Sequence, residues 1–267
     1  MKKTLLLTTL LLSVTALSSC QQVDPEFLIK VGASATPHAE ILNQVKKSLK
    51  QDGYTLKVIE YTDYIIPNIA LEDGEIDANY FQHITYLNEF NESYNTHLVS
   101  VASVHYEPLG IYAGKKKSLD QISNGDKIFI PNDLTNGGRA LYLLEKAGLI
   151  ELDENAGVKA TKYDIKSNPL NLNIVELNAE LIAPSRHDAA YAVINGNYAI
   201  SNNINVSDAL EIEDSSGLAV TAYANVIAVK EGNEESPKIQ ALKKALLTTS
   251  VRDYIINKYK GSVVPLF

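Results

Sequence analysis

The segment LIKVGASATP at residues 28–37 sets the fold class, because it is typical of a strand that passes through a loop of small residues into a helix. Its first four residues are strand-like, the loop spans 32–36, and Pro37 is well placed to open the helix. Apolar residues then recur at helical spacing as far as Leu49, and TLKVIE at residues 55–60 predicts the next strand. This order indicates a largely parallel sheet whose faces are covered by helices.

The rest of the chain continues this alternation. One doubly wound domain would be possible at this length, but two long stretches, 98–113 and 218–230, lack helical signals and could carry the chain between lobes. We therefore predict an α/β protein of two lobes, with 28–112 and 220–267 in lobe 1 and 113–219 in lobe 2. A ligand would lie between the facing strand ends. The further predicted strands are 127–130, 172–177, 189–194 and 222–229, and the further helices are 139–147, 197–200 and a terminal pair within 237–258.

The N-terminus predicts a membrane-attached lipoprotein. Lys2 and Lys3 precede TLLLTTLLL, which is too short to cross a hydrocarbon core of about 30 Å, so residues 1–19 form a predicted secretory signal. The sequence ALSSC then resembles the lipobox of bacterial lipoproteins, which implies that Cys20 carries the lipid and that 20–27 is anchor and linker. The alternative is an ordinary signal with an incidental cysteine. Since Cys20 is the only cysteine, it cannot form an internal disulfide. We expect an extracytoplasmic protein, on the outer face of a membrane or in a periplasm, held by acyl chains.

Composition excludes one class of partner. The chain has 24 basic and 32 acidic residues and a formal net charge of −8, and loss of a signal that contains two lysines would make it more acidic. Because phosphate binding requires a basic surface, we predict no nucleic-acid partner.

A search for catalytic chemistry is mostly negative. The sequence has no GxxxxGK[ST], GxGxxG, HExxH or GxSxG motif, and its five histidines show no pair at metal-ligand spacing. Adjacent carboxylates such as Glu72 and Asp73 are typical of a solvated surface. We therefore predict no enzyme activity, no metal and no cofactor. The alternative is an enzyme on a similar fold, for example a hydrolase or transferase that acts on an amino-acid derivative.

Six motifs lie in order along the chain: DANYFQH (77–83), EPLG (107–110), PNDLTNGGRAL (131–141), AVINGNYA (192–199), YANV (223–226) and GSVVP (261–265). Together they resemble those of the NlpA-type methionine-binding lipoprotein family, the substrate-binding components of bacterial methionine importers. The resemblance extends over essentially the whole mature chain. It implies a periplasmic-binding-protein-like fold, in which two α/β lobes are joined by two crossover strands and clamp an amino acid between them. It also implies an ABC permease and its ATPase subunit as partners.

Four polar residues, Arg139, Asn136, Asn225 and Asn197, are candidates to bind the polar end of a free amino acid. Arg139 is the natural partner of a carboxylate, because a guanidinium forms paired, charge-assisted bonds with it. Asn136, with the two glycines after it, predicts a tight turn just before a helix, so Arg139 would lie near a positive helix end. Asn225 lies on an apolar strand, where an amide needs a partner. The resemblance implies that this partner is the ligand, and a backbone bond is the alternative. Asn197 is either a ligand contact or a helix N-cap.

The remaining candidates surround these. Tyr80 and His83 are three residues apart, so on a helix they would share a face and could wall an apolar pocket suited to a thioether. Phe81 belongs either to this wall or to the core. Glu107, with Tyr106 beside it in the first crossover, could pair with a ligand ammonium or with a lysine.

Departures from the family pattern concern the ligand side chain. Leu134 and Thr85 replace prolines that are common in the family, and the chain has no tryptophan. Methionine, in the L and possibly the D form, is the expected ligand. Another small amino acid, a methionine-containing dipeptide, or a surface interaction role without transport are the alternatives.

Overall fold

The computed structural model describes residues 24–214 and 218–267. The predicted signal, Cys20 and the first part of the linker lie outside the described residues.

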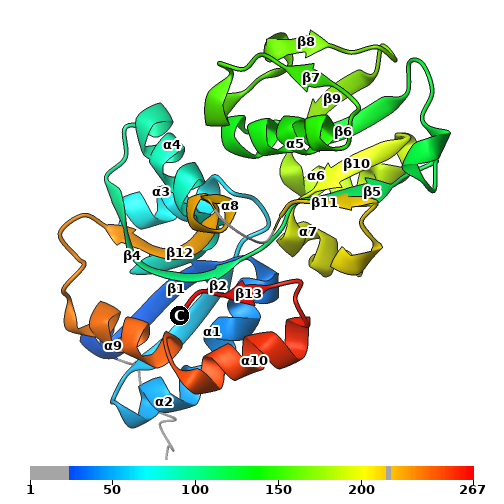
Figure 1. Cartoon of the computed structure of the whole chain (residues 1–267). Coiled ribbons are helices and arrows are strands. Elements are labelled where there is room, and N and C mark those ends of the chain that lie inside the picture. The colour runs from blue at the N-terminus through cyan, green and yellow to red at the C-terminus, as the bar shows by residue number, and fades with distance from the viewer. Residues whose placement is uncertain (1–23, 215–217) are drawn as a thin grey trace, which may run out of the picture.

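Two separate sheets form the two halves of the molecule, one below the other in Figure 1. The first sheet has the order β13-β4-β12-β3-β1-β2 and the second has the order β11-β5-β10-β6-β9. A small two-stranded sheet, β7 and β8, accompanies the second. The predicted α/β fold of two lobes is therefore confirmed. The strands of the first sheet are β1 (Leu28–Ala33), β2 (Thr55–Glu60), β3 (Ala78–His83), β4 (Leu98–Tyr106), β12 (Ala224–Lys230) and β13 (Val264–Pro265). The others are β5 (Gly110–Ala113), β6 (Lys127–Pro131), β7 (Glu151–Leu152), β8 (Ile165–Ser167), β9 (Asn173–Leu177), β10 (Tyr191–Ile194) and β11 (Glu211–Ile212).

Helices cover the sheets, as their apolar spacing requires. In the first lobe, Ile29 and Val31 of β1 are fully buried and join a core with Ile41, Leu42 and Leu246 from the surrounding helices. The helices of the first lobe are α1 (Glu40–Gln44), α2 (Lys46–Gln51), α3 (Ile66–Glu72), α4 (Ile84–Tyr94), α9 (Pro237–Leu246) and α10 (Thr249–Tyr259). Those of the second are α5 (Leu134–Lys146), α6 (Ala179–Ser185) and α7 (Gly196–Ser201), and α8 (Leu218–Ala222) lies on the return path. The short turns are η1 (Pro25–Phe27), η2 (Ala35–Ala39), η3 (Leu119–Gln121), η4 (Gly157–Lys159), η5 (Lys162–Asp164), η6 (Arg186–Asp188) and η7 (Val206–Asp208).

Both sheets are mixed rather than purely parallel. β1 runs parallel to β2 and β3, and β6 runs parallel to β9 and β10. β12 runs antiparallel to β3 and β4, and β5 runs antiparallel to β10. β13 also runs antiparallel to β4, and β11 runs antiparallel to β5.

The first passage lies between β4 and β5, earlier than the predicted boundary after residue 112. β5 pairs with β10 over Gly110–Ala113 and so belongs to the second sheet. The second passage runs from β11 to β12 and includes the short helix α8, so the prediction that 218–230 lacks helix is wrong at its start. Helix α8 has only five residues, and four of them are alanine, leucine or valine. A segment this short cannot show helical periodicity.

Two local predictions around the site are also wrong. Residues 80–83 belong to strand β3 rather than to a helix, and all six residues of that strand are buried. A strand buried on both faces has no alternation to distinguish it from a helix. Asn136 lies in helix α5, which begins at Leu134, and not in a turn before it. The Asp133 side chain caps this helix and accepts a hydrogen bond from the backbone N–H of Asn136 at 2.9 Å. The two glycines therefore lie inside the helix.

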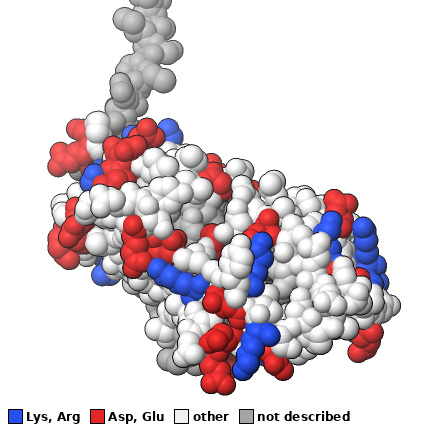
Figure 2. Space-filling model, turned by 90° about the horizontal axis from the view of Figure 1, so that it is seen from above, with Lys and Arg blue, Asp and Glu red and all other residues white. Residues whose placement is uncertain are grey.

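The surface agrees with an acidic chain. On the face drawn in Figure 2, the described Lys and Arg side chains lie interspersed with Asp and Glu, unlike the continuous basic stripe that a nucleic-acid backbone requires. Within residues 24–214 and 218–267, no helix has the length and apolar character needed to cross a membrane.

Candidate functional site

A pocket with a volume of about 20 Å³ lies between the two sheets. This is room for about one water molecule, so the walls must move apart to admit a ligand of amino-acid size. Its walls come from both lobes and from the first passage between them. The lining residues are Tyr64, Phe81, Gln82, His83, Tyr86, Glu107, Asn136, Arg139, Asn195, Gly196, Asn197 and Asn225.

Most of the predicted site residues line this pocket, and two do not. Tyr80 is fully buried in the core of the first lobe, where its hydroxyl bonds to Nδ1 of His105. Tyr106 is also fully buried, and its hydroxyl donates to Glu213 at 2.7 Å. The structure therefore places both tyrosines behind the pocket wall. The predicted residues that line it are Phe81, His83, Glu107, Asn136, Arg139, Asn197 and Asn225.

The other lining residues were not singled out from the sequence. Asn195 and Gly196 directly follow β10, and Tyr64 follows β2 by a few residues. Since ligands in open α/β sheets lie beyond the carboxyl ends of strands, that rule applied to every strand would have found them. Tyr86 and Gln82 gave no comparable signal, because each lies within a regular element.

Arg139 is buried and already paired with a carboxylate of the protein. Its Nε donates to Glu213 Oε1 at 3.1 Å and its Nη2 donates to Oε2 at 2.5 Å. Its Nη1 donates to Asn136 Oδ1 at 3.1 Å, and the guanidinium lies 4.0 Å from the ring centre of Tyr223. Burial lowers the pKa of Arg139, but the Glu213 carboxylate more than offsets this and raises the pKa above its ordinary value. The residue therefore remains a fixed cation.

Asn136 links the two lobes. Its Oδ1 accepts hydrogen bonds from Arg139 Nη1 and, at 2.9 Å, from Asn195 Nδ2. His83, from the first lobe, lies with Nε2 3.1 Å from the same oxygen. The backbone N–H of Tyr86 donates to His83 Nδ1 at 3.0 Å, so the ring proton is on Nε2. Burial, with the charge of Arg139, lowers the pKa of His83 to about 3, so the ring is neutral at physiological pH.

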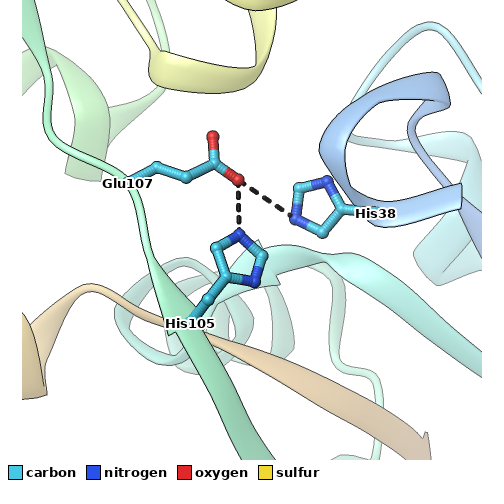
Figure 3. A group of neighbouring side chains, drawn as sticks. All are labelled: His38, His105 and Glu107. Atoms are coloured by element: carbon cyan, nitrogen blue, oxygen red, sulfur yellow. Dashed lines mark hydrogen bonds and ion pairs between the residues drawn. The ribbon is translucent and has the colours of Figure 1, made fainter. Parts of the chain in front are cut away.

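Glu107, which lines the pocket, lies against two buried histidines, His38 and His105 (Figure 3). His105 Nε2 is 2.6 Å and His38 Nε2 is 3.4 Å from Oε1 of Glu107. Burial lowers the pKa of His38 to about 4 and that of His105 to about 3, and burial raises the pKa of Glu107. Each of the three residues has one nitrogen or oxygen atom that could bind a metal ion, and these three atoms lie within 4.8 Å of one another. Sequence spacing gave no sign of this group, because His38 and His105 come from distant segments.

Aromatic side chains form the opposite wall. Tyr64 lies with its ring centre 5.8 Å from those of both Phe81 and Tyr86, and 5.0 Å from that of Tyr198 in the second lobe. The Tyr198 hydroxyl donates to the carbonyl of Thr62 at 3.0 Å. These contacts join the lobes beside the pocket and give it one apolar side.

The comparisons with known proteins decide the family. Residues 29–267 match the model of the family described as NlpA lipoprotein. The chain belongs to the NlpA lipoprotein family. It is 45% identical over 245 residues to the methionine-binding lipoprotein MetQ of Bacillus subtilis, covering 89% of this chain and 88% of that protein.

Two solved structures resemble this NlpA-family chain closely. A nutrient-binding protein from Burkholderia cenocepacia, bound to methionine, is 38% identical with a TM-score of 0.84, covering 90% of this chain and 100% of that chain. The substrate-binding protein of a methionine transporter from Streptococcus pneumoniae is 33% identical with a TM-score of 0.84, covering 90% of this chain and 96% of that chain.

Two buried polar atoms in the pocket wall lack a hydrogen-bond partner among the described residues. They are Oδ1 of Asn195, an acceptor, and Nδ2 of Asn197, a donor. The Tyr64 hydroxyl donates to Asn197 Oδ1 at 2.6 Å, which fixes the amide so that Nδ2 is its open end. Because burying an unpaired polar group costs about 1–3 kcal/mol, such atoms indicate a ligand that pairs with them. In this NlpA-family pocket the ligand must supply both a donor and an acceptor.

Proposed function

We propose that this chain is a substrate-binding lipoprotein that captures methionine in the closed cleft and delivers it to an ABC-type importer. The observation that carries the proposal is the combination of opposite charges, unpaired amides and an aromatic wall in one small pocket. A free amino acid has a carboxylate, an ammonium and a side chain, and the pocket has a counterpart for each.

The cation Arg139 is the proposed partner of the ligand carboxylate. Glu213 occupies Nε and one N–H of Nη2, and the Glu107 carbonyl takes the other. Asn136 takes one N–H of Nη1, so the second N–H of Nη1 is the one proposed to bind the ligand. The unpaired Nδ2 of Asn197 would supply a second donor to the ligand. Charge-assisted bonds of this kind are stronger than neutral ones, so Arg139 is expected to dominate carboxylate recognition.

The ammonium has two proposed acceptors. Glu107 is a buried carboxylate at the pocket wall, and the Oδ1 of Asn195 is unpaired. An ammonium placed between them would pair with the buried carboxylate and satisfy the unpaired acceptor, and both groups are costly to bury without a partner.

The aromatic wall is the proposed site of the thioether. Tyr64, Phe81 and Tyr86 present ring edges and faces to the pocket. A thioether sulfur gains about 0.3–1.5 kcal/mol from such contacts, which favours methionine over an aliphatic chain of the same length. The methionine-binding relatives support this assignment.

Binding without turnover and attachment through Cys20 complete the proposal. The relatives are substrate-binding proteins, and a lipid on Cys20 would hold the chain at the extracytoplasmic face of a membrane, next to a permease and its ATPase subunit.

Calorimetry tests the proposal with protein that begins after Cys20 and has been unfolded and refolded to remove retained ligand. The titrants are L-methionine, D-methionine, norleucine and a methionine dipeptide. We expect L-methionine to bind more tightly than norleucine, and mass spectrometry to recover it unchanged. Tighter binding of norleucine or of the dipeptide would overturn the methionine assignment, and a covalent product would overturn the binding-only role.

A further inference from the structure

The two buried histidines meet at a single oxygen of Glu107 (Figure 3). His38 lies in η2, directly after β1, and His105 lies in β4. Both rings are almost completely inaccessible to solvent, whereas Glu107 lines the pocket. Thus the histidines do not touch a ligand, but they touch the residue that is proposed to hold its ammonium.

The hydrogen bonds place the proton of each ring. Among the described residues, the hydrogen-bond partner of His105 Nε2 is a carboxylate oxygen, which accepts, so Nε2 carries the proton and donates it. Its Nδ1 then accepts from the Tyr80 hydroxyl. In His38 the proton is likewise on Nε2, because Nε2 faces the amide oxygen of Asn225, which accepts. Its Nδ1 then accepts from the Ser34 hydroxyl, whose oxygen lies 2.6 Å away. Every ring nitrogen of the pair has a partner within the protein, which favours a hydrogen-bonded network over a metal centre.

The network orients a second pocket residue as well. His38 Nε2 lies 3.0 Å from Oδ1 of Asn225 and 3.4 Å from Oε1 of Glu107. Donation to Asn225 Oδ1 engages the oxygen end of that amide, so its nitrogen is the end left for a ligand. Donation from His105 Nε2 to Oε1 leaves Oε2 of Glu107 as the oxygen with free acceptor capacity toward the pocket.

We propose that His38 and His105 are positioning residues that make the pocket selective for a ligand with a protonated α-amino group. They keep Glu107 as an ionised acceptor and hold its carboxylate in one orientation. This inference rests on the proposed function, because it assigns the ammonium to Glu107. It adds that amine recognition depends on two residues that never contact the ligand.

The test compares two ligands and two substitutions by calorimetry. The ligands are L-methionine and its desamino analogue, methylthiobutanoate, which differs only by the lost amine. His105→Leu removes both ring nitrogens, whereas His105→Gln keeps an N–H donor near the place of Nε2. We expect His105→Leu to weaken methionine binding at least about tenfold and to change analogue binding less than about threefold. We expect His105→Gln to recover methionine affinity to within about threefold of the unaltered protein.

The outcomes separate the two proposals. Equal losses for both ligands in His105→Leu, or a glutamine variant as weak as the leucine variant, would overturn the positioning role. If the unaltered protein does not bind methionine, the proposed function fails and the selectivity proposal fails with it. Circular dichroism and thermal melting check folding. Should His105→Leu not fold, the pair His38→Leu and His38→Gln gives the same comparison with the same expected result.

Discussion

Replacement of Arg139 by alanine separates the two interactions of its guanidinium, one with the protein and one with the ligand. Within the protein, Arg139 holds the Glu213 carboxylate through two hydrogen bonds of 3.1 and 2.5 Å. The side chain of Arg139 is 3% exposed and that of Glu213 is 14% exposed, so solvent does little to compensate for a lost partner. Removal of one member of such a buried pair costs about 3–5 kcal/mol of unfolding free energy.

Loss of ligand affinity is a second, separate effect of the substitution. A charge-assisted hydrogen bond contributes about 1.5–3 kcal/mol, so loss of the guanidinium is expected to weaken methionine binding by about tenfold to a hundredfold. The double variant Arg139→Ala with Glu213→Gln removes the unpaired charge on Glu213. It should recover about 2 kcal/mol of stability relative to Arg139→Ala alone, whereas the binding loss should remain.

Urea unfolding measures stability, calorimetry measures binding, and Glu213→Gln alone is the matched control. The reasoning is refuted if the double variant binds methionine as tightly as the unaltered protein. That result would mean that Arg139 serves only to pair with Glu213, and that another residue binds the ligand carboxylate.

Three further changes test other parts of the structure. Gly196→Ala would bring a Cβ within 2.9 Å of Glu107 Cβ and 3.0 Å of its Oε2, so we expect at least about a tenfold loss of methionine affinity by calorimetry; unchanged affinity would show that the contact does not form in the bound state. His83, whose pKa is lowered to about 3 by burial, stays neutral in the folded protein while the unfolded chain takes up a proton below about pH 6.5. Stability should therefore fall as pH decreases from 7 to 5, by about 2 kcal/mol for this residue. His83→Gln should make the pH profile of thermal melting less steep without flattening it, because the lowered pKa values of His38 and His105 act in the same direction; the raised pKa of Glu107 opposes this trend in part. Cys20→Ser in the full-length chain should move the protein from the membrane fraction to the soluble fraction, and retention in membranes would contradict lipid attachment.

The fold was predictable because its signals are local. The strand and helix that begin at residue 28, the terminal pair α9 and α10, and most of the other strands are apolar runs of ordinary length bounded by polar or small residues. Strand β3 was not predictable, because a strand buried on both faces lacks the alternation of apolar and polar residues that identifies a strand. That error assigned Tyr80 to the pocket, whereas the strand directs it into the core.

Parts of the site were predictable where residue chemistry or a family motif pointed to a ligand. Arg139 could be named because a guanidinium is the natural partner of a carboxylate, and Asn225 because an amide on an apolar strand requires a partner. The partner of Arg139 could not, because Glu213 is one of many acidic residues and is brought to it only by the return passage. The same holds for His38 and His105, which become a pair only when β1 and β4 join one sheet.

The central claim is that the closed cleft is built for the zwitterion and thioether of methionine. The measurement is the thermal-melting temperature of refolded protein with L-methionine, compared across the twenty amino acids. At a ligand concentration about a thousand times the dissociation constant, binding should add about 4 kcal/mol of stability, and the account predicts that L-methionine gives the largest shift. A larger shift with another amino acid, or no shift with any of them, would contradict it.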